Sequence, residues 1–195
     1  MKTSNIVLLS ILGFFIFTGL YIIGTGNGLV AKEEAVNSAY SQVQNVYQRR
    51  LDLIPNLVET VKGYASHEKE TLTAVAQARN QATKVTLPAN ATPEQLKAYQ
   101  DAQVGLGNAL SRLLAVSEKY PELKANENFM DLQKQLEGTE NRIAVERKVF
   151  NDTTQSYNYA VKSFPTSIIA GFKGLTTKPY FEADAQAKTA PKVKF

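Results

Sequence analysis

The residues that could perform acid–base or metal chemistry are few in this sequence, and their spacing assembles no known catalytic motif. His67 is the sole histidine, and HEKET from His67 onward matches the zinc-protease motif H-E-x-x-H only without its second histidine. The chain also lacks cysteine, which excludes transition-metal clusters built from thiolates or several imidazoles. We therefore interpret His67 as a solvated surface residue.

Other catalytic patterns are equally weak. The carboxylate pairs Glu137/Glu140 and Glu68/Glu70 are of the kind that glycosidases use as acid and base, but on long helices such pairs usually lie on a solvated face. The sequence contains neither a G-x-x-x-x-G-K nucleotide loop nor a G-x-S-x-G elbow. We predict no catalytic residue, no metal ligand and no cofactor.

A group of charged and amide side chains interrupts the apolar pattern of two predicted helices. Arg50 falls near the stripe position between Tyr47 and Ile54, and polar residues interrupt the stripe around Ile143. A half-buried Arg–Glu pair between helices would fix their register, provided that its hydrogen bonds are satisfied. We predict such an inter-helix polar clamp, with a ligand or partner contact as the alternative. The candidate residues are Arg49, Arg50, Glu140, Asn141 and Arg147.

The amino-terminal stretch from Ile6 to Ile23 carries no charge over about 18 residues. As a helix it would extend roughly 27 Å, close to the hydrocarbon thickness of a bilayer. A cleaved signal peptide has a shorter apolar region and ends at a small-residue site, whereas GTGNG follows here. We predict a retained transmembrane anchor with a short flexible linker over residues 1–28. The residues assigned to the span include Ile6, Leu9, Leu12, Phe15, Phe17, Leu20 and Ile23.

The rest of the chain is dominated by Ala, Gln, Glu, Lys, Leu and Asn, mostly good helix formers, while β-branched and aromatic runs are scarce. Apolar residues recur at steps of three, four and seven, a pattern typical of coiled-coil-like seams. These stripes predict helices over about 29–84, 93–119 and 127–164. We expect an all-α fold, with one N-terminal transmembrane helix followed by an antiparallel bundle of three to four long helices over residues 29–165.

Prolines and capping residues set the expected helix ends. Pro55 removes one backbone hydrogen bond from the first helix of the bundle. Because the apolar stripe keeps its phase across Pro55, we predict a kink there, with a turn between two helices as the alternative. The residues TPEQ from Thr92 to Gln95 predict a capping box with proline at the first helical position. Asn126 is the expected start of the last long helix.

The C-terminal tail, residues 166–195, alternates apolar groups with Gly and Pro and is too apolar for an ordinary disordered tail. We expect it to pack down the outside of the bundle, with contact to a membrane or a partner as the alternative. Its apolar residues are Ile168, Ile169, Phe172, Leu175, Tyr180, Phe181 and Phe195.

The charge pattern argues against nucleic-acid binding. The formal net charge of +4 arises from 22 basic and 18 acidic residues. Proteins that bind nucleic acids gather Lys and Arg on one face or in a tail, whereas adjacent cations occur here only as Arg49–Arg50 and Arg147–Lys148. Counterion release needs several aligned cations, so we expect no nucleic-acid partner.

Long collinear runs of the sequence carry a family resemblance. They are QRRLDLIPNLVETVKGYASHEKETL (48–72), YPELKANENFMDLQKQLEGTENRIAVERKVFN (120–151), YNYAVKSFPTSIIAG (157–171) and YFEADAQAKTAPKVKF (180–195). These runs resemble the bacterial LemA family, with Leu51 where an aromatic is common and Lys194 where an acid is common. The resemblance implies an anchored, antiparallel helical bundle without an established enzymatic activity. Family members are described with a short amino terminus outside and the domain in the cytoplasm, although an envelope-facing domain has also been considered.

These features together predict a membrane-anchored, non-enzymatic scaffold or adaptor. We expect the N-terminal helix to lie in the lipid bilayer, and the helical domain to form a homo-oligomer or to bind a membrane protein. The expected location is the bacterial cytoplasmic (inner) membrane, with a single span and the side of the domain left open. Two alternatives are a membrane-surface hydrolase that uses Glu140, Arg147 or His67, and a lipid-binding, membrane-remodelling protein that uses the apolar tail.

Overall fold

The described part of the chain is helical. The computed structural model describes residues 3–88 and 91–182, and no strand occurs within these ranges. The helices are α1 (Thr3–Tyr64), α2 (Lys69–Lys84), α3 (Pro93–Val116), the short 3-10 helix η1 (Ser117–Lys119), α4 (Pro121–Lys124), α5 (Glu127–Lys162) and α6 (Thr166–Phe172). The expected all-α class, with a long apolar N-terminal helix followed by helices that pack together, is confirmed.

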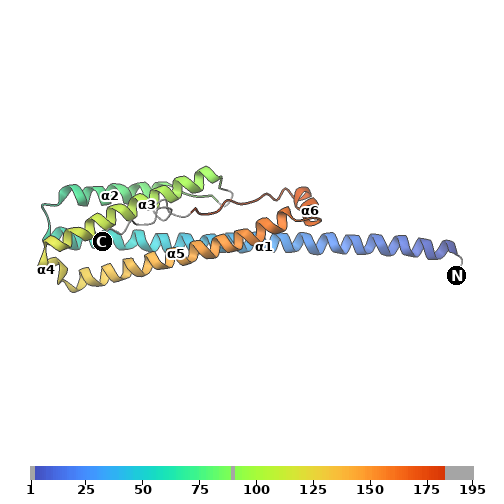
Figure 1. Cartoon of the computed structure of the whole chain (residues 1–195), viewed down its shortest axis with the longest axis horizontal. Coiled ribbons are helices and arrows are strands. Elements are labelled where there is room, and N and C mark those ends of the chain that lie inside the picture. The colour runs from blue at the N-terminus through green and yellow to red at the C-terminus, as the bar shows by residue number, and fades with distance from the viewer. Residues whose placement is uncertain (1–2, 89–90, 183–195) are drawn as a thin grey trace, which may run out of the picture.

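The helix α1 is the axis of an elongated molecule (Figure 1). Its 62 residues extend about 93 Å at 1.5 Å per residue. The helix α5 lies along α1 and runs in the opposite direction, while α2 and α3 pair with each other beside them. The short helix α6 contacts both α1 and α5. The first part of α1 projects alone from this packed body.

The flexible linker expected after the span is wrong, because α1 continues as a helix through residues 25–28. Each glycine in a helix interior costs up to about 1 kcal/mol relative to alanine. Packing offsets part of this cost here: Gly26 is buried beneath the side chain of Lys173, and Leu29 is buried in the first turn after the glycines. The apolar stretch and the packed body therefore share one uninterrupted helix.

Pro55 lies inside α1, so the alternative of a turn at this residue is wrong. Proline lacks an N–H, which leaves the carbonyl of Leu51 without its usual helical donor. The side chain of Arg79 in α2 replaces that donor, because its Nε donates to the Leu51 oxygen at 3.2 Å. The predicted kink at Pro55 stays a prediction.

The helix predicted over 29–84 is divided in two at residues 65–68, which corrects the expected boundary. Ala65 is fully buried at this point, and the Glu68 N–H donates to the Ala65 carbonyl at 3.1 Å to close a turn. The apolar stripe resumes in α2, where Val75 is fully buried. Periodicity alone therefore conceals the reversal of the chain.

The predicted helix starts agree with the structure. In the capping box of α3, the Gln95 N–H donates to Thr92 Oγ1 at 3.3 Å, and the Thr92 N–H donates to Gln95 Oε1 at 2.9 Å. At the start of α5, Asn126 Oδ1 accepts a hydrogen bond from the Phe129 N–H at 3.0 Å. These bonds satisfy N–H groups that a helix leaves unpaired at its first turn.

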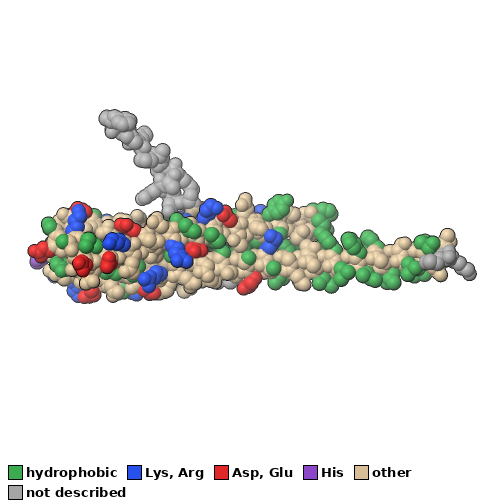
Figure 2. All heavy atoms as spheres, turned by 90° about the horizontal axis from the view of Figure 1, so that it is seen from below, with side chains coloured by type: hydrophobic (Ala, Val, Ile, Leu, Met, Phe, Trp, Pro, Cys, Tyr) green, Lys and Arg blue, Asp and Glu red, His purple; other side chains and the backbone are tan. Residues whose placement is uncertain are grey.

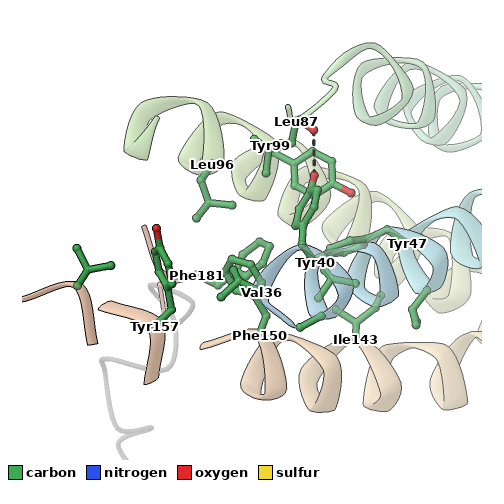
Figure 3. Close-up of a cluster of buried hydrophobic side chains, with 14 of the residues drawn as sticks. Val36, Tyr40, Tyr47, Leu87, Leu96, Tyr99, Ile143, Phe150, Tyr157 and Phe181 are labelled. Atoms are coloured by element: carbon green, nitrogen blue, oxygen red, sulfur yellow. Dashed lines mark hydrogen bonds between the residues drawn. The ribbon is translucent and has the colours of Figure 1, made fainter. Parts of the chain in front are cut away.

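The buried apolar side chains form two cores along the packed body. The distal core, farther from the projecting end of α1, consists of Leu51, Leu53, Ile54, Leu57, Val61, Ala65, Val75, Ala82, Leu106, Ala109, Leu110, Leu113, Val116, Leu123, Phe129 and Leu136. The basal core, nearer that end, consists of Leu29, Val36, Ala39, Tyr40, Val43, Val46, Tyr47, Leu87, Leu96, Tyr99, Ile143, Phe150, Tyr157, Val161, Ile169, Ala170 and Phe181. Figure 3 shows the basal core.

The projecting end of α1 is an apolar surface against which none of the described residues pack. This helix is long and apolar enough to span a membrane. Figure 2 shows its hydrophobic side chains covering the narrow end of the molecule. The residues assigned to the span are all exposed, from 51% to 70% of their surface: Ile6, Leu9, Leu12, Phe15, Phe17, Leu20 and Ile23.

Candidate functional site

A polar layer separates the distal core from the basal core. Arg50 of α1 is buried to 6% exposure between Tyr47 of the basal core and Leu51 of the distal core. Its Nη2 donates to Glu140 Oε2 of α5 in an ion pair. The Glu140 carboxylate is 58% exposed, so only one of the two charges leaves water. Such a pair links two helices at a fixed register, while removal of Glu140 would strand a buried cation.

A cavity of about 500 Å³ opens beside this ion pair, between α3 and α5. Its lining includes Arg50, Gln103 and Glu140. Gln103 is 3% exposed, and neither its Nε2 nor its Oε1 has a hydrogen-bond partner among the described residues. A buried amide without partners costs about 1–3 kcal/mol per group. The lining therefore combines polar groups with apolar side chains such as Leu110 and Leu136.

Three of the five predicted clamp residues, Arg50, Glu140 and Arg147, line this cavity together. Arg147 also donates from Nη2 to the main-chain oxygen of Glu182 at 2.5 Å. Arg49 lies outside the cavity and donates to Gln135 Oε1 at 3.1 Å, and Asn141 is exposed on α5. The structure thus joins Arg50 to Glu140 and connects Arg147 to the C-terminal segment.

The cavity brings together Glu140 and Arg147 of the hydrolase alternative, whereas its third residue, His67, lies apart from them. His67 is exposed in the turn between α1 and α2. Glu140 pairs with Arg50, and the helix from Arg50 to Tyr64 alone extends about 21 Å. Within residues 3–88 and 91–182, no group of three or more His, Asp or Glu side chains is arranged to hold a metal ion.

The C-terminal segment after α6 lies against the basal core, and side-chain amides hold its main chain. Asn158 Nδ2 donates to the Lys178 oxygen, and the Lys178 N–H donates to Asn158 Oδ1, both at 2.8 Å. Asn151 pairs in the same way with the main chain of Phe181, both bonds being 2.9 Å. Each asparagine side chain therefore bonds to both the N–H and the C=O of one residue in the segment.

A third amide, on α3, repeats this arrangement one residue farther along. Gln100 Nε2 donates to the Glu182 oxygen at 2.6 Å, and the Glu182 N–H donates to Gln100 Oε1 at 3.3 Å. Gln100 and Asn158 are 7% and 5% exposed. These side chains act on the segment as a neighbouring strand would, with main-chain bonds that do not depend on the sequence of the segment.

The spacing of these contacts shows that the segment is extended and antiparallel to α5. Asn151 and Asn158 are separated by seven helical residues, or about 10.5 Å along the axis. Their partners Phe181 and Lys178 are separated by three residues, which cover about 10 Å when extended. The two lengths agree, so an extended chain is the conformation that fits both amides.

Side chains add an anchor at each end of the docked segment, which we define as residues 178–182. The Phe181 ring is 4% exposed and meets Phe150 edge-on at 5.2 Å between centroids, as the close-up in Figure 3 shows. The guanidinium of Arg147 lies over the Phe181 ring at 5.4 Å. Lys178 Nζ contacts Glu33 Oε1 of α1 at 3.2 Å. The docked segment therefore touches α1, α3 and α5.

Burial changes the acidity of the tyrosines in the basal core. Burial raises the pKa of Tyr40 to about 12, although the hydrogen bond from Gln44 acts in the opposite direction. The pKa of Tyr99 is also raised, first by burial and then by the neighbouring Tyr40 and Tyr47. The Tyr40 hydroxyl donates to the Leu87 oxygen at 3.3 Å (Figure 3). These phenols are therefore neutral structural groups at ordinary pH.

The amide contacts were missed by the sequence reasoning, although a signal for them exists. Phe150 and Tyr157 lie seven residues apart on the apolar stripe of α5, and each is followed directly by an asparagine. Two asparagines at the same heptad position beside a buried stripe lie on one side of the helix. Of the apolar tail residues, Ile169 and Phe181 are buried on the bundle, whereas Ile168, Phe172 and Tyr180 are exposed. Phe195 lies outside the described residues.

The comparisons with known proteins cover most of this chain. The sequence model of the LemA family matches residues 39–195. The magnetosome protein MamQ of Magnetospirillum gryphiswaldense is 28% identical over 173 residues, which cover 80% of this chain and 64% of that protein. Protein LemA of Metamycoplasma hominis is 25% identical over 177 residues, which cover 91% of this chain and 77% of that protein. The chain thus spans less than two thirds of the length of the MamQ relative.

Proposed function

This chain belongs to the LemA family, and we propose that it is a non-enzymatic scaffold anchored by a single span in the bacterial cytoplasmic membrane. In this role α1 fixes the helical body at the bilayer, and the body associates with further copies of itself. A membrane protein is the second class of partner that such a body could hold.

The observation that carries the proposal is the continuity of α1 from the apolar projection to the distal core. Residues 6–23 expose apolar side chains, whereas Val36, Val43, Leu57 and Val61 of the same helix are buried to 1% exposure or less. Because no loop separates the two parts, the orientation of the span in the bilayer is transmitted directly to the body. A stiff helical link of this kind is suited to holding a binding surface at a set distance from a membrane.

A second copy of the chain is the partner best supported by the exposed face of α5. Val145, Val149 and Tyr159 are 59%, 44% and 76% exposed. Val149 and Tyr159 follow Val145 by four and fourteen residues, which places all three on one side of the helix. A stripe of this type buries itself efficiently against an identical stripe on another helix.

Mass photometry of the full chain in a mild detergent tests self-association. We expect species containing two or more copies, and we expect Val149→Glu to shift them toward the monomer because a charge enters the seam. Lys148→Glu is the matched control, since this neighbouring side chain is 77% exposed and changes charge outside the stripe. A chain that is strictly monomeric, and that retains no membrane protein on purification, contradicts the scaffold.

The hydrolase alternative makes a different prediction for Glu140. If Glu140 were catalytic, Glu140→Gln would abolish an activity and leave the fold intact. In the scaffold, the same change weakens the partner of Arg50 and lowers the melting temperature instead. Circular dichroism melts of the two proteins separate these outcomes.

The side of the membrane on which the body lies can be found with single cysteines, because the natural chain has none. A cysteine at the exposed residue Ser66 would be labelled from one side of intact cells only. Labelling by a membrane-impermeant maleimide places the body outside the cytoplasm, and protection until lysis places it inside. Ser4→Cys, before the span, should give the opposite result.

Lipid contact through α6 and the residues just before it is a second candidate function, favoured by three exposed apolar side chains: Ile168 and Phe172 within α6, and Phe164 before its start. Phe164, Ile168 and Phe172 are 81%, 52% and 90% exposed. They lie near the point where α1 leaves the packed body, since Lys173 covers Gly26. Aromatic side chains at this level suit the interfacial region of a bilayer.

Tryptophan fluorescence tests this contact, because the chain contains no tryptophan. Phe172→Trp should be quenched when the full chain is placed in bilayers with brominated lipids. Tyr64→Trp, at the far end of α1, is the matched control and should not be quenched. Equal fluorescence of Phe172→Trp in brominated and ordinary lipids rules out the contact.

A further inference from the structure

The groove that receives the docked segment has the chemistry of a peptide-binding site. Its polar groups are the side-chain amides of Gln100, Asn151 and Asn158, and each is paired with both the N–H and the C=O of one residue of the segment. Its apolar part is the side of Phe150 that meets Phe181. A groove with this arrangement selects an extended main chain and one aromatic side chain.

Departure of the docked segment would open both polar and apolar parts of the groove. The low exposure of Gln100 and Asn158, both under one tenth, is that of the groove with the segment in place, so their amides would bond to water once it leaves. The Phe150 ring would lose the Phe181 ring that meets it, and burial of apolar surface is what favours a bound segment. A second peptide with the same aromatic side chain and the same main-chain groups would restore these contacts.

We propose that this groove also binds the docked segment of a second copy of the chain, so that neighbouring molecules exchange residues 178–182. The proposal rests on the self-association proposed above and names the contact through which it is completed. The second copy offers an identical Lys178, Phe181 and Glu182, so every main-chain pair and the aromatic contact are reproduced.

The anchor favours this exchange by geometry. Copies held in one bilayer by α1 stand at the same height, and rotation of a copy about the membrane normal leaves its docked segment at the level of its neighbour's groove. The segment also keeps its direction, antiparallel to α5. Anchoring confines the copies to the membrane surface, which raises the effective concentration of the second segment.

The connection before the docked segment has the features of a hinge. Gly174 has φ of +67° and no atom close to the position of a Cβ. Thr176 and Thr177 are exposed. Residues 173–177 can extend about 17 Å. For the docked segment to lie on an adjoining copy, the Leu175 N–H must leave the Ala170 oxygen and the Leu175 side chain must leave the basal core, while Thr166–Phe172 stays helical.

Cross-linking between two differently tagged full-length chains in one membrane tests the exchange. One chain carries Glu33→Cys in the groove, and the other carries Lys178→Cys in the docked segment; these side chains are in contact in the native protein. With no other cysteine present, a short bis-maleimide joins the two tags when the segment of one copy lies in the groove of the other, and chance encounters in the membrane set the background. We expect a cross-linked heterodimer.

Variants of the Lys178→Cys chain show whether the heterodimer reflects docking. Phe181→Ala removes the buried anchor and should reduce the heterodimer at least about tenfold, as for a central interface residue. Tyr180→Ala is the matched control, because this neighbouring ring is 44% exposed and should leave the yield unchanged. A heterodimer that is insensitive to Phe181→Ala reflects random proximity and overturns the exchange.

The failure of this proposal can be told apart from the failure of self-association. A single chain that carries both cysteines reports docking within one copy through its internal cross-link. If mass photometry finds oligomers but the cross-linking yields only the internal product, exchange is overturned and self-association stands. If the chain is monomeric and only the internal product forms, both proposals are overturned.

Discussion

The distal and basal cores lie along the same two helices, α1 and α5, but they are closed by different means. The distal core is almost entirely aliphatic, with Phe129 as its one aromatic member, and its side chains all come from helices and the turn after α1. The basal core gathers Tyr40, Tyr47, Tyr99, Phe150, Tyr157 and Phe181, and the last of these comes from a segment without regular structure. One core is sealed by helix against helix, the other by a docked peptide.

This difference indicates a division of labour along the molecule. Aliphatic side chains that interdigitate between helices lose packing over a wide area when one is removed. A short segment held by three amides and one ring can leave while the helices stay folded, because its contacts are few and local. The polar layer at Arg50 and Glu140 lies between the two cores.

The largest expected effect tests the distal core. Leu113 is fully buried there, and Leu113→Ala should lower the free energy of unfolding by about 2–5 kcal/mol, from lost transfer energy and the cavity left behind. Thermal and denaturant unfolding of the full chain in detergent, followed by circular dichroism, measures this loss. Val104→Ala on the same helix, where the side chain is 40% exposed, should cost far less. A loss below about 1 kcal/mol for Leu113→Ala would show that the distal core is loosely packed.

The next effect should be local and confined to the basal core. Asn151→Ala leaves the N–H and C=O of Phe181 without partners, which costs about 1–3 kcal/mol per buried group. Because the docked segment can leave as a unit, the loss should appear as faster hydrogen exchange at Phe181 and Glu182. Exchange at Leu113 should be unchanged.

Asn141→Ala is the control for Asn151→Ala, since Asn141 is exposed on the same helix. Its hydrogen exchange should match that of the natural chain throughout. Should Asn151→Ala accelerate exchange equally in both cores, the two regions unfold as a single unit and the division of labour is wrong.

The same division explains which parts of the fold the sequence could predict. Heptad steps through Leu136, Ile143, Phe150 and Tyr157 report burial against another helix, and the cap at Thr92 reports a helix start, because both depend on near neighbours in the chain. The docking of Phe181 depends on Asn151, which lies 30 residues away, and on main-chain atoms that every residue shares. Nothing in the identity of the docked residues encodes bonds made by their backbone.

The break after Tyr64 escaped prediction for a related reason. The apolar stripe continues from α1 into α2, so its phase carries no sign of the reversal. Pro55 suggests a break in the helix, but α1 continues through it. The cost of the missing N–H is offset by a side chain that is distant in the sequence. Arg79, which donates to the Leu51 oxygen, is charged and looks like a surface residue in the sequence.

A smaller effect is expected for Arg79, whose hydrogen bond replaces the donor that Pro55 lacks. This contact lies on the distal side of the polar layer. Arg79→Ala should cost about 1.5–3 kcal/mol at most, the range for a hydrogen bond from a charged donor, and less in proportion to its partial exposure. Pro55→Ala restores the N–H that Leu51 normally receives and should make Arg79→Ala nearly neutral. A double-mutant cycle on urea unfolding measures this coupling. Additive effects of the two changes would show that Arg79 does not serve the proline.

The smallest effect on stability is seen only at alkaline pH. It distinguishes the two cores because the buried tyrosines belong to the basal core. The pKa of Tyr40 is raised in the folded chain from 10.0 to about 12, so the folded state holds this proton more tightly than the unfolded state. By linkage, the stabilisation is complete below pH 10 and is lost as the pH rises through about 12. The pKa values of Tyr40 and Tyr99 are both raised by burial, so their ionisation, followed as tyrosinate absorbance, should accompany loss of the near-ultraviolet dichroism of the basal core. Tyr40→Phe removes the titration but keeps the ring, and should shift that loss to higher pH. An unchanged alkaline transition in Tyr40→Phe would mean that other groups open the basal core.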